Sequence, residues 1–232
     1  MLRSLLVLSF VGTLKLLSAC FYRADMRWVG VPQPRAWRHV RIVAFLNHTS
    51  LFEPIFLAGV PWWFVWRLAR HGVVPAAEKT TRRPLVGWVF KLVARNVVPI
   101  TRERDHTWTR VLEQIDPDSM VVMAPEGRMK RANGLDSHGQ PMTVRGGIAD
   151  ILEASPDGAM LVAYSGGLHH VQVPGQRLPK FFQRIGMMLE VLDIAAYRDQ
   201  MRAVGEDFKT AVKRDLERRR DLYCPRVAAP QP

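Results

Sequence analysis

The chain has 232 residues, enough for one domain with a substantial core and small extensions. An apolar content of 48% excludes a disordered protein, and 33 Lys and Arg against 21 Asp and Glu give a net charge of +12. This charge favours an anionic partner; because no zinc finger, RNA-binding sheet motif or basic zipper is present, a membrane surface fits better than nucleic acid.

The stretch from Leu2 to Phe21 is predominantly apolar, with Lys15 near its middle. As a helix it would be about 30 Å long, the thickness of a bilayer core. Because Ser4, Lys15 and Ser18 fall on one side, we expect a membrane-associated helix that lies at the interface or tilts so that the lysine snorkels. Two alternatives stay open, a cleaved secretory signal and a lipoprotein box at Leu17-Ser18-Ala19-Cys20.

The apolar run Val40–Leu46 predicts a buried strand, and Asn47-His48-Thr49-Ser50 follows it directly. An imidazole between a strand end and a helix start can take a proton from a hydroxyl, because its usual pKa of about 6.5 lies near neutral pH. If the helix begins near Ser50, Glu53 can turn back to hold one ring nitrogen of His48. Alternatively, Ser50 and Glu53 form a capping box and His48 is an ordinary turn residue.

The rest of the chain alternates between strand-like and helical patterns. Strand-like runs fall near 40–46, 96–101, 120–124, 160–165 and 187–194, and helical patterns near 51–59, 84–95, 106–115, 144–154 and 198–221. This alternation predicts an α/β fold, a layered mixed sheet flanked by helices, with an amino-terminal membrane-associated helical segment. We place that segment at 1–36, a catalytic domain at 37–197, and a carboxy-terminal helix and tail at 198–232. The basic end of the carboxy-terminal helix, Arg218-Arg219-Arg220, is expected to be a solvated helix cap.

No metal site is predicted. His169 and His170 follow a Gly-Gly turn, but adjacent histidines point apart on a strand and no third ligand accompanies them. Cys20 and Cys224 have neither metal-ligand spacing nor a disulfide framework.

Three groups of residues, His48-x4-Glu53, Ile100-x-Arg102 and Pro125-Glu126-Gly127, occur in this order after strand-like runs. Over roughly residues 40–170 this pattern resembles the glycerolipid acyltransferase family, which includes 1-acylglycerol-3-phosphate acyltransferases. Glu53 replaces the aspartate of the family's Asn-His-x4-Asp. In its Phe-Pro-Glu-Gly-Thr-Arg-Ser block, Ala124, Arg128 and Met129 replace phenylalanine, threonine and arginine.

The resemblance implies transfer of a fatty acyl group from acyl-CoA or acyl carrier protein to the hydroxyl of a lysophospholipid such as 1-acylglycerol-3-phosphate, without a further cofactor. His48 would be the general base and Glu53 its orienting carboxylate. No nucleophile is required: the chain has no Gly-x-Ser-x-Gly elbow, and neither cysteine lies near a motif. We therefore expect direct transfer through a ternary complex.

The same resemblance suggests which residues bind the acceptor. Arg102 is the first candidate for its phosphate, with help from Arg128 and Lys130. Glu126 would bind a glycerol hydroxyl or position Arg102, and backbone amides of the turn at Gly127 would face the oxyanion.

Membrane lipids are the expected partners, at the cytoplasmic face of the inner membrane, where activated acyl donors reside. Trp62, Trp63 and Trp66 are compatible with that interface or with the core. An exported lipoprotein would be separated from those donors. Alternatives are the same chemistry on a lyso-aminolipid, and a non-catalytic basic membrane-binding protein.

Overall fold

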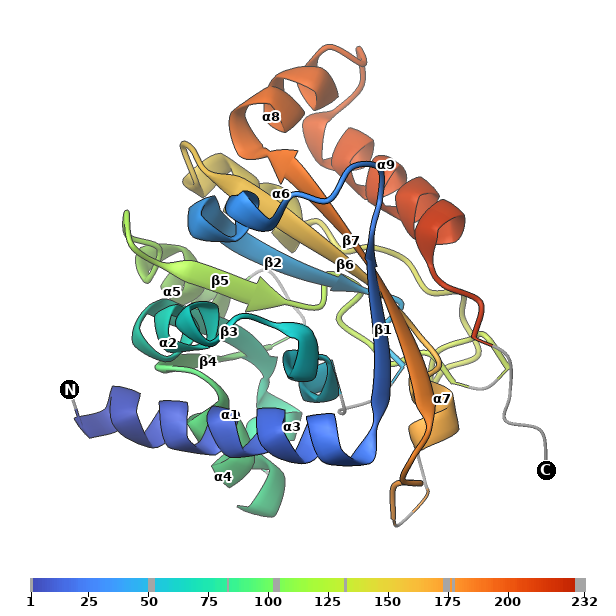
Figure 1. Cartoon of the computed structure of the whole chain (residues 1–232). Helices are drawn as coiled ribbons and strands as arrows, with labels where there is room; N and C mark the ends of the chain where they lie inside the picture. Colours follow the sequence, from blue (N-terminus) through green and yellow to red (C-terminus); the bar gives the residue numbers. More distant parts are fainter. Residues whose placement is uncertain are drawn as a thin grey trace.

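The computed structural model describes residues 2–49, 53–82, 84–101, 105–131, 133–172, 176 and 178–227. Its strands form one seven-stranded sheet in the order β1-β7-β6-β2-β5-β3-β4 (Figure 1). Their bounds are Arg23–Trp28 (β1), Val40–Leu46 (β2), Gly72–Ala77 (β3), Asn96–Ile100 (β4), Met120–Met123 (β5), Ala159–Gly166 (β6) and Arg184–Asp193 (β7). The pairs are parallel except β6 with β7, so the sheet is mixed.

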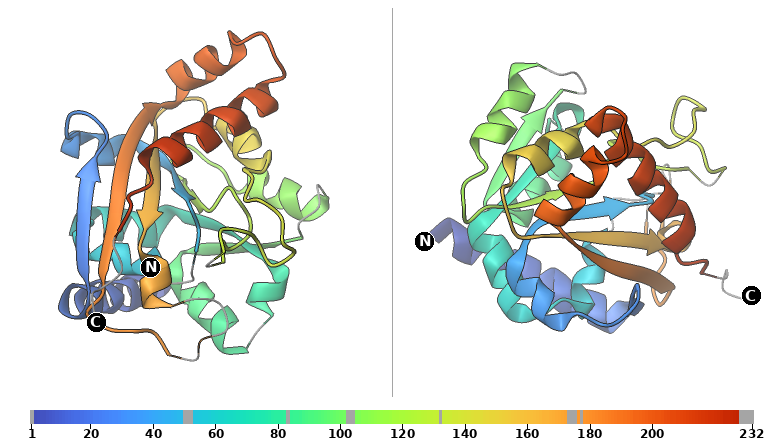
Figure 2. Two further views of the ribbon diagram at one scale, coloured as in Figure 1. Left: turned by 90° about the vertical axis from the view of Figure 1, so that its right-hand side faces the viewer. Right: turned by 90° about the horizontal axis from the view of Figure 1, so that it is seen from above.

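Helices cover both faces of the sheet. The α-helices are Leu2–Phe21 (α1), Trp62–His71 (α2), Glu78–Thr81 (α3), Pro84–Val93 (α4), His106–Glu113 (α5), Gly147–Ala154 (α6), Leu168–Val171 (α7), Ile194–Arg202 (α8) and Phe208–Tyr223 (α9). Two 3-10 helices are Pro34–His39 (η1) and Glu53–Gly59 (η2). Seen from above in Figure 2, blue α1 lies on one side of the sheet and yellow α6 with red α9 on the other.

Strand β2 shows why the sheet is covered on both faces. Ile42, Ala44 and Leu46 belong to the core formed with α6, α8 and α9. Val40 and Val43 belong to a second core, formed with η2 and α2. Since successive side chains of a strand point to opposite faces, a strand that is apolar almost throughout must be buried on both sides. The residues that follow β2 are therefore carried by a rigid central element.

The predicted fold class is confirmed, but several elements differ from expectation. Residues 53–59 form a 3-10 helix rather than an α-helix, and β3 and α2 were not predicted. Residues 23–28, expected in a helical segment, are the edge strand β1. The helix expected at 198–221 is two helices, α8 and α9, with Gly205 between them at a φ of 83° that favours glycine.

Lys15 faces the protein, not the outside as a snorkelling lysine would. It is buried, and its Nζ donates to three backbone carbonyls at the end of η2, those of Leu57 (2.9 Å), Ala58 (2.7 Å) and Val60 (2.8 Å). The last carbonyls of a helix have no partner within it, and a cation there satisfies them. Lys15 therefore fastens α1 to η2.

Candidate active site

The loops that follow β2 and β6 are tied together at the carboxyl edge of the sheet. Asn47 directly follows β2 in a left-handed conformation, with a φ of 62°. Its Nδ2 donates to the Ser165 carbonyl at 2.7 Å, and the Ser165 hydroxyl donates to the Asn47 carbonyl at 3.0 Å. Functional residues of parallel sheets gather at this edge, and His48 is the next residue.

The His48 imidazole is in contact with the Glu53 carboxylate. Nδ1 lies 2.7 Å from Oε1, and the two side chains are 17% and 10% exposed. Glu53 is the first residue of η2, so a rigid element presents it to the ring. The carboxylate–imidazole contact that the sequence suggested is present. The alternative capping box needs Ser50, which lies outside the described residues. A proton on Nδ1, facing Glu53, leaves the Nε2 lone pair as the acceptor.

The surroundings of His48 favour its charged form. Burial lowers the pKa of the imidazole, but the charge and hydrogen bond of Glu53, together with the charge of Glu126, outweigh it and leave the pKa above its ordinary value. Within the described residues, Nδ1 is the ring nitrogen that has a hydrogen-bond partner. The site therefore holds an imidazole that is stabilised once it has accepted a proton at Nε2.

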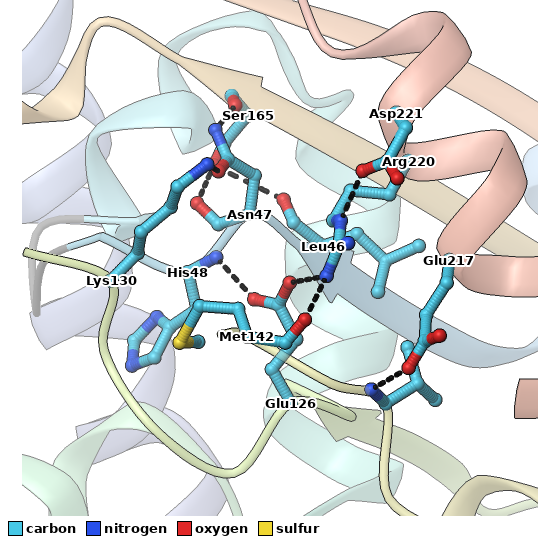
Figure 3. Close-up of polar contacts among 11 residues, drawn as sticks. Leu46, Asn47, His48, Glu126, Lys130, Met142, Ser165, Glu217, Arg220 and Asp221 are labelled. Atoms are coloured by element: carbon cyan, nitrogen blue, oxygen red, sulfur yellow. Dashed lines mark hydrogen bonds and ion pairs between the residues drawn. The ribbon is translucent and has the colours of Figure 1, made fainter. Parts of the chain in front are cut away.

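Glu126 binds protein donors through both carboxylate oxygens. It is 1% exposed. Oε2 accepts the backbone N–H of His48 at 2.8 Å, and Oε1 accepts Nη1 of Arg220 at 3.0 Å (Figure 3). In Figure 3 the imidazole points away from this carboxylate. We expected Glu126 at a glycerol hydroxyl or beside Arg102. Its carboxylate engages the backbone of His48 and a residue of α9, while a contact with Arg102, which lies outside the described residues, stays a prediction.

Gly127 forms a tight turn. Its φ is 63°, a left-handed conformation that favours glycine. Its N–H donates to the Ala124 carbonyl at 3.0 Å. This amide is therefore engaged within the turn, and a contact of the other amides of the turn with an oxyanion stays a prediction.

Comparison with known proteins identifies the family of this chain. The sequence model of the family described as acyltransferase matches residues 31–165, more than half of the chain. The chain belongs to the acyltransferase family. The crystal structure of the 1-acyl-sn-glycerophosphate (LPA) acyltransferase PlsC from Thermotoga maritima is similar in fold, with a TM-score of 0.56 and 15% identity over 94% of this chain and 77% of that one. A sequence search of curated proteins found no match.

Of the two arginines expected first at an acceptor phosphate, Arg128 lies within the described residues. Arg128 of this acyltransferase forms an ion pair with Asp136. The backbone N–H of Gln140 first, then Arg128 and the backbone N–H of His138, hold the pKa of Asp136 at about 2 against the effect of burial. Arg128 therefore stabilises the loop to which it belongs. Arg102 lies outside the described residues, and its phosphate contact stays a prediction.

Two residues make contacts in the site that were not predicted from the sequence. The Lys130 backbone N–H donates to the His48 carbonyl at 2.7 Å, and its Nζ donates to Asn47 Oδ1 at 3.2 Å. Arg220, expected to be a solvated cap, has a side chain only 13% exposed. A signal was present: Arg220 follows the buried Val212 and Leu216 at intervals of four residues, which places all three on one face of α9.

Cys224 lies close to the site, contrary to the expectation that neither cysteine is near a motif. Burial above all, and then the charge of Glu126, raise the pKa of its thiol to about 12. A thiol with this pKa is protonated at neutral pH and is a poor nucleophile. The position of Cys224 therefore gives no support to a covalent acyl-enzyme.

His169 and His170 lie on the short helix α7, not on a strand. Their ring centroids are 4.0 Å apart, so the rings do not point apart as expected. Among the described residues, no group of three or more His, Cys, Asp or Glu side chains is arranged to hold a metal ion.

Proposed function

We propose that this acyltransferase moves a fatty acyl group from acyl-CoA or acyl carrier protein to the hydroxyl of a lysophospholipid such as 1-acylglycerol-3-phosphate. The observation that carries the proposal is the 2.7 Å contact between His48 and Glu53, inside the region that matches the family. The fold likeness to a protein named as a 1-acyl-sn-glycerophosphate acyltransferase supports this acceptor class.

In the proposed reaction, Nε2 of His48 takes the proton of the acceptor hydroxyl as its oxygen attacks the thioester carbonyl. Glu53 holds the Nδ1 proton and stabilises the imidazolium that results. The tetrahedral intermediate collapses with cleavage of the carbon–sulfur bond, and the leaving thiolate takes the proton from Nε2. The products are the acylated lipid and the free thiol of the carrier, with no acyl-enzyme between them.

For the acceptor phosphate, Arg102 remains our first choice. The ion pair of Arg128 with Asp136 is a reason to keep a second acceptor class, since a guanidinium already bound to a carboxylate is less available to a phosphate. A lyso-aminolipid, acylated by the same chemistry, is that second class.

We further propose that the outer side of α1 binds the cytoplasmic face of the inner membrane. Helix α1 is long and apolar enough to cross a membrane, with a mean hydropathy of 1.9, but its other side is fastened to the protein by Lys15. Exposed apolar side chains lie on α1 (Leu2, Leu5, Leu6, Leu16, Leu17, Phe21) and on neighbouring segments (Trp62, Trp63, Trp88, Phe181, Phe182). The ring centroids of Phe21 and Phe181 are 5.4 Å apart, which joins the two sets. A helix lying along the surface fits this arrangement.

The test is a transfer assay with labelled palmitoyl-CoA and palmitoyl-acyl carrier protein, across a panel of lyso-lipids, with His48→Ala in parallel. We expect product from lysophosphatidic acid and a loss of about 1,000-fold in the variant, with vesicle binding unchanged. Product only from acceptors without phosphate would contradict the role of Arg102. Equal activity of the variant would contradict the general base, and no product from any acceptor would favour a non-catalytic membrane-binding protein.

A further inference from the structure

We propose that Arg220, on the carboxy-terminal helix α9, is a positioning residue for His48 that acts through Glu126. The inference rests on the proposed role of His48 as the base. It assigns a part in the reaction to a helix that lies beyond residues 31–165, the region that matches the family.

The first observation is the chain of contacts itself. The Glu126 side chain is 0% exposed, and one oxygen accepts Nη1 of Arg220 while the other accepts the backbone N–H of His48. A carboxylate removed from water requires a paired charge, and here Arg220 supplies it. Without that charge, the Glu126 carboxylate would be stabilised by turning toward water, and this change would weaken its hydrogen bond to His48.

The second observation is that α9 also holds the segment that supports the Glu126 turn. Arg220 Nη1 donates to the Met142 carbonyl at 2.9 Å, and Glu217 Oε1 accepts the Val144 N–H at 2.7 Å (Figure 3). The next residue, Arg145, donates its N–H to the Pro125 carbonyl at 2.8 Å. The contacts thus run from α9 through residues 142–145 to the residue before Glu126.

The third observation is the backbone conformation at the end of β2. Asn47 is one of two described residues other than glycine with a positive φ, a conformation that needs external support. The peptide groups of the next residue are held on both sides: Glu126 accepts the His48 N–H, and the Lys130 N–H donates to its carbonyl. Loss of the Glu126 contact would leave the position of the imidazole less well defined.

The proposal predicts a specific kinetic effect. In Arg220→Gln we expect kcat to fall about 10- to 100-fold, because a displacement of about 1 Å can cost a factor of this size. The KM values for both substrates should stay within about two-fold, since neither Arg220 nor Glu126 contacts them in the proposed mechanism. Arg220→Lys keeps a cation near Glu126 and should recover part of the lost kcat.

Arg219 provides a matched control. Its side chain is 12% exposed against 13% for Arg220, and it also binds carboxylates, those of Glu190 and Asp215. These partners belong to β7 and to α9 itself. Arg219→Gln should lower the melting temperature at least as much as Arg220→Gln, yet leave kcat within about two-fold. Equal losses of kcat in both variants would overturn the proposal.

Two measurements separate positioning from general damage. If Arg220 acts through Glu126, the double variant Glu126→Gln/Arg220→Gln should lose little more kcat than the more affected single variant; additive losses would contradict the proposal. Hydrogen exchange at the His48 amide requires no activity. It should become at least about 10-fold faster in Arg220→Gln than in Arg219→Gln, and equal protection would overturn the proposal. A wild-type protein without transfer activity would refute the proposed function, and the exchange experiment would still test the contact.

Discussion

At the scale of single residues, the His48–Glu53 contact shows what the replacement of aspartate by glutamate requires. The extra methylene moves the carboxylate further from the backbone, yet Oε1 lies 2.7 Å from Nδ1. The residue begins a 3-10 helix whose other end is fastened to α1 by Lys15. A longer side chain on a fixed element can thus occupy the position beside the ring.

Replacement of Glu53 by glutamine should affect both rate and pH dependence. The variant loses the charge that raises the pKa of His48, so burial dominates and that pKa falls. Since the base must be neutral, the acid limb of kcat/KM should move to lower pH, while kcat falls about 100-fold because the imidazolium is less stabilised. A pH–rate profile between about pH 5 and 9 measures both. The control is Glu113→Gln, on the exposed end of α5, which should change neither kcat nor the acid limb. If Glu53→Gln also changed neither, the capping-box interpretation would be restored.

The residues that were predicted and those that were missed differ in the separation of their partners along the chain. His48 and Glu53 are five residues apart and follow an apolar strand, so local pattern brings them together. Arg220 and Glu126 are 94 residues apart, and no local pattern reports which helix end lies beside which loop. Lys15 and its acceptors in η2 are separated in the same way. The sequence therefore predicts the strand-end residues but not the contacts that hold them.

At the scale of secondary structure elements, the sequence patterns predicted five of the seven strands and missed β1, at one edge of the sheet, and β3, in its interior. β2 is apolar almost throughout and was expected. The edge strand β1 alternates exposed Arg23, Asp25 and Arg27 with partly buried residues, and charged residues at an edge guard it against pairing with another chain. Because of these charged residues, the strand has no continuous apolar run by which it could have been predicted. In β3, Pro75 weakens the strand pattern, although the residue lies within the strand.

Because Lys15 joins α1 to η2, we expect this residue to stabilise the folded protein. Lys15→Met leaves the carbonyls of Leu57, Ala58 and Val60 without their cation and should lower the free energy of unfolding by about 2–3 kcal/mol. Thr13→Ala on the exposed side of the same helix should change it by less than about 0.5 kcal/mol. Denaturant titrations of the purified variants measure both values. Tighter vesicle binding by Lys15→Met without a loss of stability would show that this lysine faces lipid.

At the scale of the whole molecule, the proposed membrane surface and the proposed base are linked through η2. The first residue of η2 is Glu53, beside His48, and its last carbonyls bind Lys15 of α1. The outer side of α1 is apolar, and the net charge of +12 favours an anionic membrane surface. In this proposal one short helix, η2, contacts both the membrane-bound helix α1 and the base His48.

This arrangement predicts that membrane binding and catalysis can be separated. Leu16 and Leu17 are 59% and 47% exposed on α1, so replacing both by glutamine should leave the melting temperature unchanged and weaken binding to anionic vesicles about 10-fold or more. The KM for an acceptor presented in vesicles should rise, whereas kcat for the same acceptor in detergent micelles should stay within about two-fold. Val204→Gln is the control, because Val204 is 47% exposed between α8 and α9. The connection between these two helices lies at the end of the molecule away from α1 (Figure 1). If both variants bound vesicles equally well, the membrane surface would lie elsewhere, and the link through η2 would serve only to support Glu53.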